Sequence, residues 1–156
     1  MGKFNNKISA EYNPPRKWIL ERALSYTNPD IDEVALERVG VDVTGSKITV
    51  KKDFVTDLAS VPRVCWAFIA PWDVARAAII HDLLYKCIRQ YRAECSKGLK
   101  NSEDPKVISN AKKASDDVFH MAMKDAEPSV AGWKIAAAYY SVRMFGRWSI
   151  IPREGD

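Results

Sequence analysis

The stretch DVARAAIIHDLLYKCIRQYR, residues 73–92, decides how the rest of the chain is interpreted. Drawn as a helix, it surrounds His81, one of two histidines in the chain, with apolar residues at helical spacing. Asp82 follows directly, and Tyr85 lies one turn further on. A buried imidazole or carboxylate costs free energy unless it has a partner. The sequence therefore predicts that this helix carries either a functional site or a polar network inside the core.

A partner for the histidine is expected on a second long helix, predicted over Lys106–Ala126. Its helical phase turns Asp116 towards the packed side and Asp117 towards solvent. If the two helices pack side by side, Asp116 can accept a hydrogen bond from one ring nitrogen of His81 and fix the tautomer. The other nitrogen would then take a proton from water or hold a metal. Tyr85 is expected to steady the same carboxylate.

Two further carboxylates are candidate ligands for a divalent cation, Ca²⁺ or Zn²⁺. Asp82 offers a hard oxygen ligand of the kind that Ca²⁺ takes. Asp57, in the stretch VTDLASVPR between the predicted sheet and the helices, is a candidate further ligand, with an Asx-turn as the alternative. Arg63 either binds an anion or pairs with a carboxylate such as Asp57. The alternative for the whole cluster is a hydrogen-bonded core network without chemistry, since structural networks share these features.

The order of patterns along the chain predicts an α+β fold, with a small N-terminal antiparallel sheet followed by a bundle of three to four helices. We expect one domain over residues 1–156, with a flexible lead-in at 1–16, the sheet at 17–54 and the helical part at 55–148. The predicted strands are residues 17–27, the end of 33–44, and 47–54, with a tight turn at Gly45-Ser46. The predicted helices are residues 61–69, 73–92, 106–126 and 130–147, with a polar loop at 94–105.

The last of these helices has an apolar stripe that we expect to face inward. Its members are Trp133, Ala136, Ala137, Tyr140 and Met144. Because Arg143 and Arg147 stand near its end, the alternative is a helix that lies on a membrane surface.

Composition narrows the classes of partner and compartment. The net charge of +4 is spread along the chain, which gives no strong nucleic-acid signal. Three scattered cysteines indicate reduced thiols in a cytoplasmic protein rather than a disulfide framework. The N-terminal stretch lacks the apolar region of a signal peptide, and no uncharged apolar run is long enough to predict a transmembrane segment.

Four stretches together resemble a family of small phage and prophage proteins known as a domain of unknown function. They are FVTDLASVPR (54–63), AAIIHDLLY (77–85), SDDVFHMAM (115–123) and YYSVRMFG (139–146). The resemblance covers residues 47–148, and Leu58 stands where we expect the family's glycine. It implies a phage or prophage source, a place in the host cytoplasm or the virion, and partners among phage structural proteins or host proteins. It implies no activity.

The pattern His81-Asp82-x-x-Tyr85, followed by a helical Asp116, is also similar to phospholipase A2, especially its small parvoviral and bacterial versions. That resemblance implies that the histidine activates water, the adjacent aspartate binds Ca²⁺, and the distant aspartate and the tyrosine orient the histidine. Those enzymes place a glycine-rich calcium loop before this helix. Here no glycine lies between residues 45 and 98, so a cation site would have to be built differently, around Asp57.

Two functions follow from these observations. One is a metal-dependent hydrolase, an esterase or phospholipase A2-like enzyme that uses the His-Asp pair. The other is a non-enzymatic phage protein, either a tail or neck component of the virion or an effector directed at a host protein.

Overall fold

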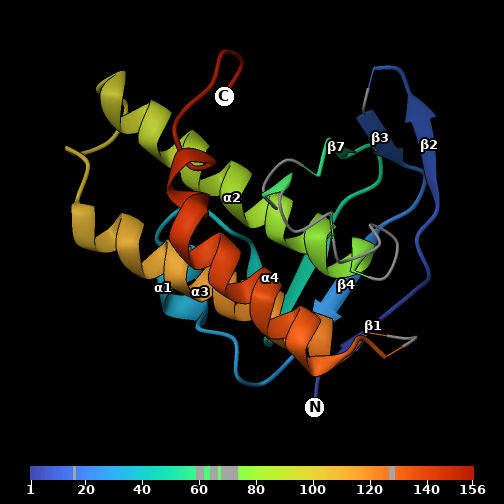
Figure 1. The fold of residues 1–156 in the computed structure, drawn as a ribbon. Coiled ribbons are helices and arrows are strands. Elements are labelled where there is room, and N and C mark those ends of the chain that lie inside the picture. The colour runs from blue at the N-terminus through green and yellow to red at the C-terminus, as the bar shows by residue number, and fades with distance from the viewer. Residues whose placement is uncertain (16, 59–61, 64–66, 68–73, 127–128) are drawn as a thin grey trace.

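The computed structural model of the chain describes residues 1–15, 17–58, 62–63, 67, 74–126 and 129–156. In this part of the chain, two small antiparallel sheets stand beside three long helices (Figure 1). The strands are β1 (Lys3–Phe4), β2 (Ala10–Asn13), β3 (Lys17–Leu20), β4 (Leu24–Thr27), β5 (Val43–Thr44), β6 (Lys47–Val50) and β7 (Val55–Thr56). The helices are α1 (Glu33–Glu37), α2 (Ala75–Ser96), α3 (Pro105–Lys124), α4 (Gly132–Phe145) and the 3₁₀ helix η3 (Gly146–Trp148). The predicted α+β class is confirmed.

The larger sheet has the strand order β1-β4-β6-β5, and the smaller one has the order β2-β3-β7. Ile48 and Val50 alternate with exposed residues along β6 and are fully buried, as the period of two predicts. The predicted turn at Gly45-Ser46 is present. Both residues have positive φ, +60° and +57°, which suits the two-residue connection between β5 and β6.

The helices form the other half of the core. α2 and α3 lie side by side and run in opposite directions, and α4 packs on α3 (Figure 1). The loop between α2 and α3 begins where Gly98, at φ +72°, lets Leu99 donate its backbone N–H to the carbonyl of Glu94. Among the described residues, no helix is both long and apolar enough to span a bilayer.

The N-terminal part differs from the prediction in two ways. The lead-in at 1–16 contains β1 and β2, so its assignment as unstructured is wrong. β2 is polar because it is an edge strand with most of its residues exposed, and the sequence gives such a strand little apolar signal. The single strand predicted over 17–27 is two strands, β3 and β4, which belong to different sheets because the chain turns at residues 21–23.

The helix boundaries also shift. α2 continues to Ser96, four residues beyond the predicted end, which shortens the predicted loop at 94–105. In the stretch 33–44, a short helix precedes β5, although Val39 and Val41 are buried as expected of core residues. The predicted helix at 61–69 falls mostly outside the described residues.

The predicted inward stripe of the last helix is wrong. Ile135, Ala138 and Val142 are the buried residues of α4, whereas Trp133, Tyr140 and Met144 are each 63% exposed. The contact with α3 uses medium and small side chains, which let the two helix backbones approach closely. Trp133 and Tyr140 therefore lie on the outer side of the helix, whereas Tyr139 contacts Asp117 of α3.

Candidate active site

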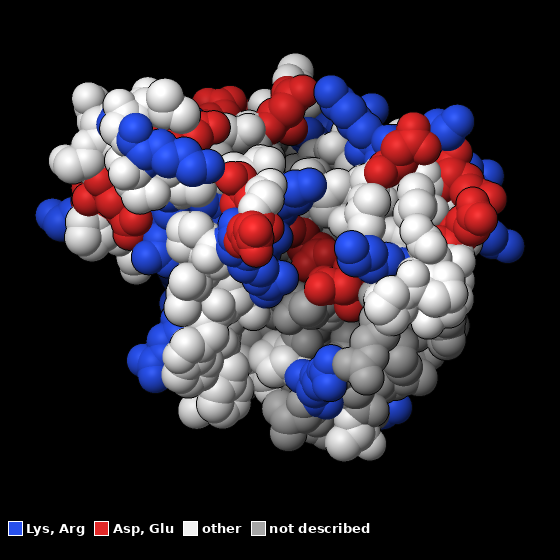
Figure 2. Space-filling view, turned by 90° about the horizontal axis from the view of Figure 1, so that it is seen from above, with Lys and Arg blue, Asp and Glu red and all other residues white. Residues whose placement is uncertain are grey.

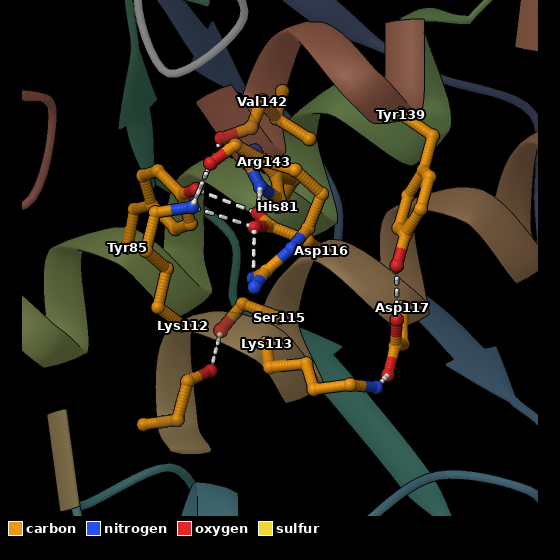
Figure 3. Close-up of polar contacts among 11 residues, drawn as sticks. His81, Tyr85, Lys112, Lys113, Ser115, Asp116, Asp117, Tyr139, Val142 and Arg143 are labelled. Carbon is orange, nitrogen blue, oxygen red and sulfur yellow. Dashed lines mark hydrogen bonds and ion pairs between the residues drawn. The ribbon is translucent and has the colours of Figure 1, made fainter. Parts of the chain in front are cut away.

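The buried carboxylate of Asp116 joins three helices (Figure 3). Its Oδ1 accepts hydrogen bonds from Nε2 of His81 at 2.9 Å and from the hydroxyl of Tyr85 at 2.6 Å, both on α2. Its Oδ2 accepts from Nζ of Lys112 at 2.8 Å and from Nη1 of Arg143 at 3.0 Å. The contacts that the sequence analysis proposed between Asp116, His81 and Tyr85 are present.

The α2 side of this arrangement follows from helix geometry. Residues four apart share a helix face, so His81 and Tyr85 stand one above the other with ring centroids 4.0 Å apart. Phe119, one turn after Asp116 on α3, closes the other side of the imidazole at 4.8 Å. Both α2 side chains are completely buried. Packing thus fixes the orientation in which Nε2 of His81 meets the carboxylate.

The surroundings keep this carboxyl charged. Burial raises the pKa of Asp116, but the hydrogen bond and charge of His81, together with those of Lys112, outweigh it and bring the pKa down to about 2. Burial and the adjacent carboxylate of Asp116 raise the pKa of Tyr85 well above its ordinary value. Tyr85 is therefore a neutral donor over the whole physiological range.

Lys112 and Arg143 were not among the predicted site residues. The Lys112 ammonium also donates to the backbone carbonyls of Val142, at 2.9 Å, and Arg143, at 3.3 Å. These carbonyls lie at the negative end of the α4 dipole, so a cation there is doubly favoured. Lys112 lies four residues before Asp116, a spacing that could have revealed the pair. Arg143 gave no such signal, because its contact depends on how α4 docks.

Asp82 points away from this network and lines a cavity of about 220 Å³. The hydroxyl of Thr56, at the end of β7, donates to the Asp82 carboxylate and accepts the backbone N–H of Leu58 at 3.1 Å. Asp57 lines the same cavity. The structure thus brings together the two carboxylates proposed as cation ligands, next to the helix that carries His81.

The cavity is mixed in charge. Its lining residues are Lys17, Phe54, Val55, Asp57, Asp82, Lys86, Arg89, Arg153, Glu154, Gly155 and Asp156. Figure 2 shows acidic and basic side chains side by side around a hollow on the face seen from above. In the part of the chain that the structure describes, no group of three or more His, Cys, Asp or Glu side chains is placed to hold a metal ion. The cavity thus has four acidic residues, Asp57, Asp82, Glu154 and Asp156, of which Asp156 is paired with Arg89.

The turn that leads into the cavity has an unusual backbone. Leu58, which stands where the family resemblance leads us to expect glycine, has φ +56°. A leucine in this left-handed region costs roughly 1 kcal/mol or more, whereas glycine adopts it freely. Glycine would adopt this conformation without that cost. Arg63 is exposed and is not among the described residues that line the cavity.

Fold and site together define an α+β protein with a buried His-Asp pair at the junction of its helices and a nearby cavity lined by acidic and basic side chains. A family model described as "Protein of unknown function (DUF1353)" matches residues 33–142, more than half of the chain. The chain belongs to this family, and His81, Asp82 and Asp116 lie within the matched region. No curated protein and no solved structure matches the chain.

Proposed function

We propose that the protein is a metal-dependent hydrolase, an esterase of the phospholipase A2-like kind. The observation that carries this proposal is the contact of His81 Nε2 with Asp116 Oδ1 at 2.9 Å, with the Tyr85 hydroxyl on the same oxygen. A carboxylate held in this way fixes one nitrogen of an imidazole as the donor and leaves the basic lone pair on the other. This is the arrangement of a histidine that takes a proton from water.

In this scheme His81 is the catalytic residue, and Asp116 and Tyr85 are positioning residues. With Nε2–H directed at Asp116, Nδ1 is the nitrogen that accepts the proton of the attacking water, and Asp116 stabilises the resulting imidazolium. Because His81 is fully buried, a substrate can meet it only after neighbouring side chains move. Activity is therefore expected to require such an opening.

The divalent cation of this scheme would be held by Asp82 and Asp57, which share the cavity. Carboxylates are the ligands that Ca²⁺ prefers, and backbone carbonyls and waters would complete its shell. A cation there supplies Lewis-acid stabilisation of the negative charge that develops on an ester carbonyl.

The cation site is tested by calorimetric titration of the protein with CaCl₂ and with ZnCl₂. We expect saturable binding to the wild type and a loss of at least tenfold in affinity for Asp82→Asn and for Asp57→Asn. The matched control is Asp42→Asn, an exposed aspartate outside this cavity, which should bind as the wild type does. Absence of binding, or equal binding by all four proteins, would reject the metal part of the proposal.

The activity is tested with carboxylic esters, phospholipid vesicles and phosphodiesters as substrates, with and without the cation. Tyr85→Phe removes the hydrogen bond to Asp116 while keeping the ring. It should lower kcat and change the pH–rate profile, because the carboxylate that orients His81 loses a hydrogen-bond donor. A purely structural tyrosine would leave that profile in place.

A second function is favoured by a different observation, the contacts of Lys112 and Arg143 with Asp116 Oδ2. They make the carboxylate a link between three helices, a role that needs no chemistry. On this hypothesis the protein is a non-enzymatic phage component of the tail or neck, or an effector bound to a host protein. Stoichiometric copies in purified virions would support the virion version, and recovery from infected cytoplasm alone would exclude it.

A further inference from the structure

The outer face of α4 carries large apolar side chains that the core does not use. Trp133, Tyr140 and Met144 follow each other at helical spacings of seven and four residues and are each 63% exposed. Just beyond the helix, Trp148 is also more than half exposed. Phe145 stacks on it at 6.0 Å between ring centroids. We call this set, residues 133, 140, 144, 145 and 148, the α4 face. Isolated exposed apolar residues are ordinary, but an aligned stripe of this kind marks an interaction surface.

The charge of the surrounding segment is one-sided. Between Ser129 and Arg153 there is no Asp or Glu, and the basic residues are Lys134, Arg143, Arg147 and Arg153. Arg143 is paired with Asp116 and Arg153 lines the cavity described above, which leaves Lys134 and Arg147 as the cations of this face. Both cations lie against the exposed rings themselves. The guanidinium of Arg147 lies 4.3 Å from the centre of a Trp148 ring, and Nζ of Lys134 lies 5.8 Å from that of a Trp133 ring. The partner of this face must therefore be both apolar and negatively charged.

From this combination we infer that the α4 face binds the surface of a membrane containing anionic lipids, with α4 lying in the plane of the interface. Trp and Tyr favour the headgroup region because one end of the side chain is apolar and the other is polar. Lys and Arg reach the lipid phosphates beside them while their aliphatic stems stay on the apolar side. No helix needs to cross the membrane for this mode of binding.

The arrangement of the fold suits such docking. α4 lies on the outside of the helical layer, in front of α3 in the view of Figure 1, and packs against α3 through its opposite side. Its inner residues, Ile135, Ala138 and Val142, remain in the core when the outer side is occupied. Docking thus needs no rearrangement of the protein.

Charge also argues against a second copy of the chain as the occupant. In a twofold-symmetric dimer built on this face, the same patch would meet itself. The positive charges at 134 and 147 would then face their symmetry mates with no acidic residue of the segment to neutralise them. An anionic lipid surface supplies the opposite charge together with an apolar layer.

The test is flotation of the full chain with phosphatidylcholine vesicles, prepared with and without phosphatidylglycerol. We expect at least tenfold stronger binding to the anionic vesicles, falling as salt is raised. Trp133→Gln/Tyr140→Gln/Met144→Gln should lower that binding at least tenfold. Lys134→Gln/Arg147→Gln should lower it about 25-fold, at about fivefold for each charge near an anionic surface.

Matched control variants lie elsewhere on the surface. Val34→Gln/Leu99→Gln removes two apolar side chains that are at least as exposed, and Lys51→Gln/Lys52→Gln removes two exposed charges. Both should bind vesicles as the wild type does. The inference is overturned if the wild type does not float with the vesicles, or if the controls lose as much binding as the α4-face variants. It is also overturned if the wild type does not bind vesicles but forms, by sedimentation velocity, a dimer that the triple variant abolishes. The result does not depend on hydrolase activity, so the two proposals can fail separately.

Discussion

Replacing Asp116 by asparagine is the most informative perturbation of the buried network. The amide keeps the size of the side chain but removes its charge, and its nitrogen is a donor. The amide nitrogen then faces one of the two pairs of donors that contact the oxygens of Asp116, and the ammonium of Lys112 is left buried without its counter-charge. Breaking a buried ion pair from one side costs about 3–5 kcal/mol of the free energy of unfolding.

The lowered pKa of Asp116 gives a separate value for this stabilisation and shows how it depends on pH. Its lowering from 3.8 to about 2 corresponds to about 2.5 kcal/mol of stabilisation. The folded-state pKa lies below the unfolded one, so between these values the unfolded chain binds more protons. The stabilisation is therefore complete above about pH 5 and is lost as the pH falls through 4 towards 2.

The assay is urea denaturation of the wild type and Asp116→Asn at a series of pH values from 7 to 3. We expect a stability difference of about 3–5 kcal/mol at pH 7 that becomes smaller with acidification. The matched control is Asp117→Asn, whose partly exposed carboxylate pairs with Lys113 at 2.5 Å and accepts from the Tyr139 hydroxyl at 2.9 Å. It should cost less than about 1 kcal/mol. Equal effects of the two substitutions, or a difference that does not change with pH, would refute this reasoning.

Three further predictions concern the supports of the site. Gly146→Ala should destabilise the protein by about 1–3 kcal/mol in thermal unfolding, because the added Cβ would lie 2.3 Å from the hydroxyl of the buried Tyr85. A Tm equal to that of the wild type would contradict this prediction. At Leu58, where φ is +56°, glycine should be more stable than alanine by about 1 kcal/mol in chemical denaturation; the reverse order would be inconsistent with the left-handed turn. Lys112→Met should lower the free energy of unfolding by about 3 kcal/mol and speed hydrogen exchange at the C-terminal end of α4. Unchanged exchange there would show that the lysine does not stabilise the end of that helix.

Much of the site could be predicted because it depends on the phase of single helices. The spacing of His81 and Tyr85 puts both on one face of α2. The same argument on α3 separates the inward Asp116 from the outward Asp117. Once two long amphipathic helices are expected to pack together, few partners remain for a buried histidine.

What could not be predicted depends on contacts between elements. Arg143 reaches Asp116 only because α4 docks on α3 at one particular rotation, and that rotation is set by Ile135, Ala138 and Val142. α4 is apolar on both sides, so periodicity alone cannot decide which side faces the core. The size of the side chains indicated the wrong side, because Trp133 and Tyr140 are on the outer one.

The prediction of the strands was incomplete for a related reason. Strands of two to four residues contain too few alternations to define a period, and edge strands have little apolar pattern. The split between β3 and β4 is therefore invisible in the sequence. The Gly45-Ser46 turn could be predicted, because glycine in a short connection between alternating residues is a local signal.

The central claim is that His81 acts as a base in hydrolysis. The most direct test compares how fast the wild type and His81→Gln turn over an ester or phospholipid substrate in the presence of Ca²⁺. Glutamine can keep a donor towards Asp116 but cannot take up a proton, and circular dichroism with urea denaturation verifies that the variant is folded. The account predicts cation-dependent turnover by the wild type and Asp117→Asn, and a loss of at least about 100-fold in folded His81→Gln. No turnover by the wild type on any of the substrates, or equal turnover by the histidine variant, would contradict it.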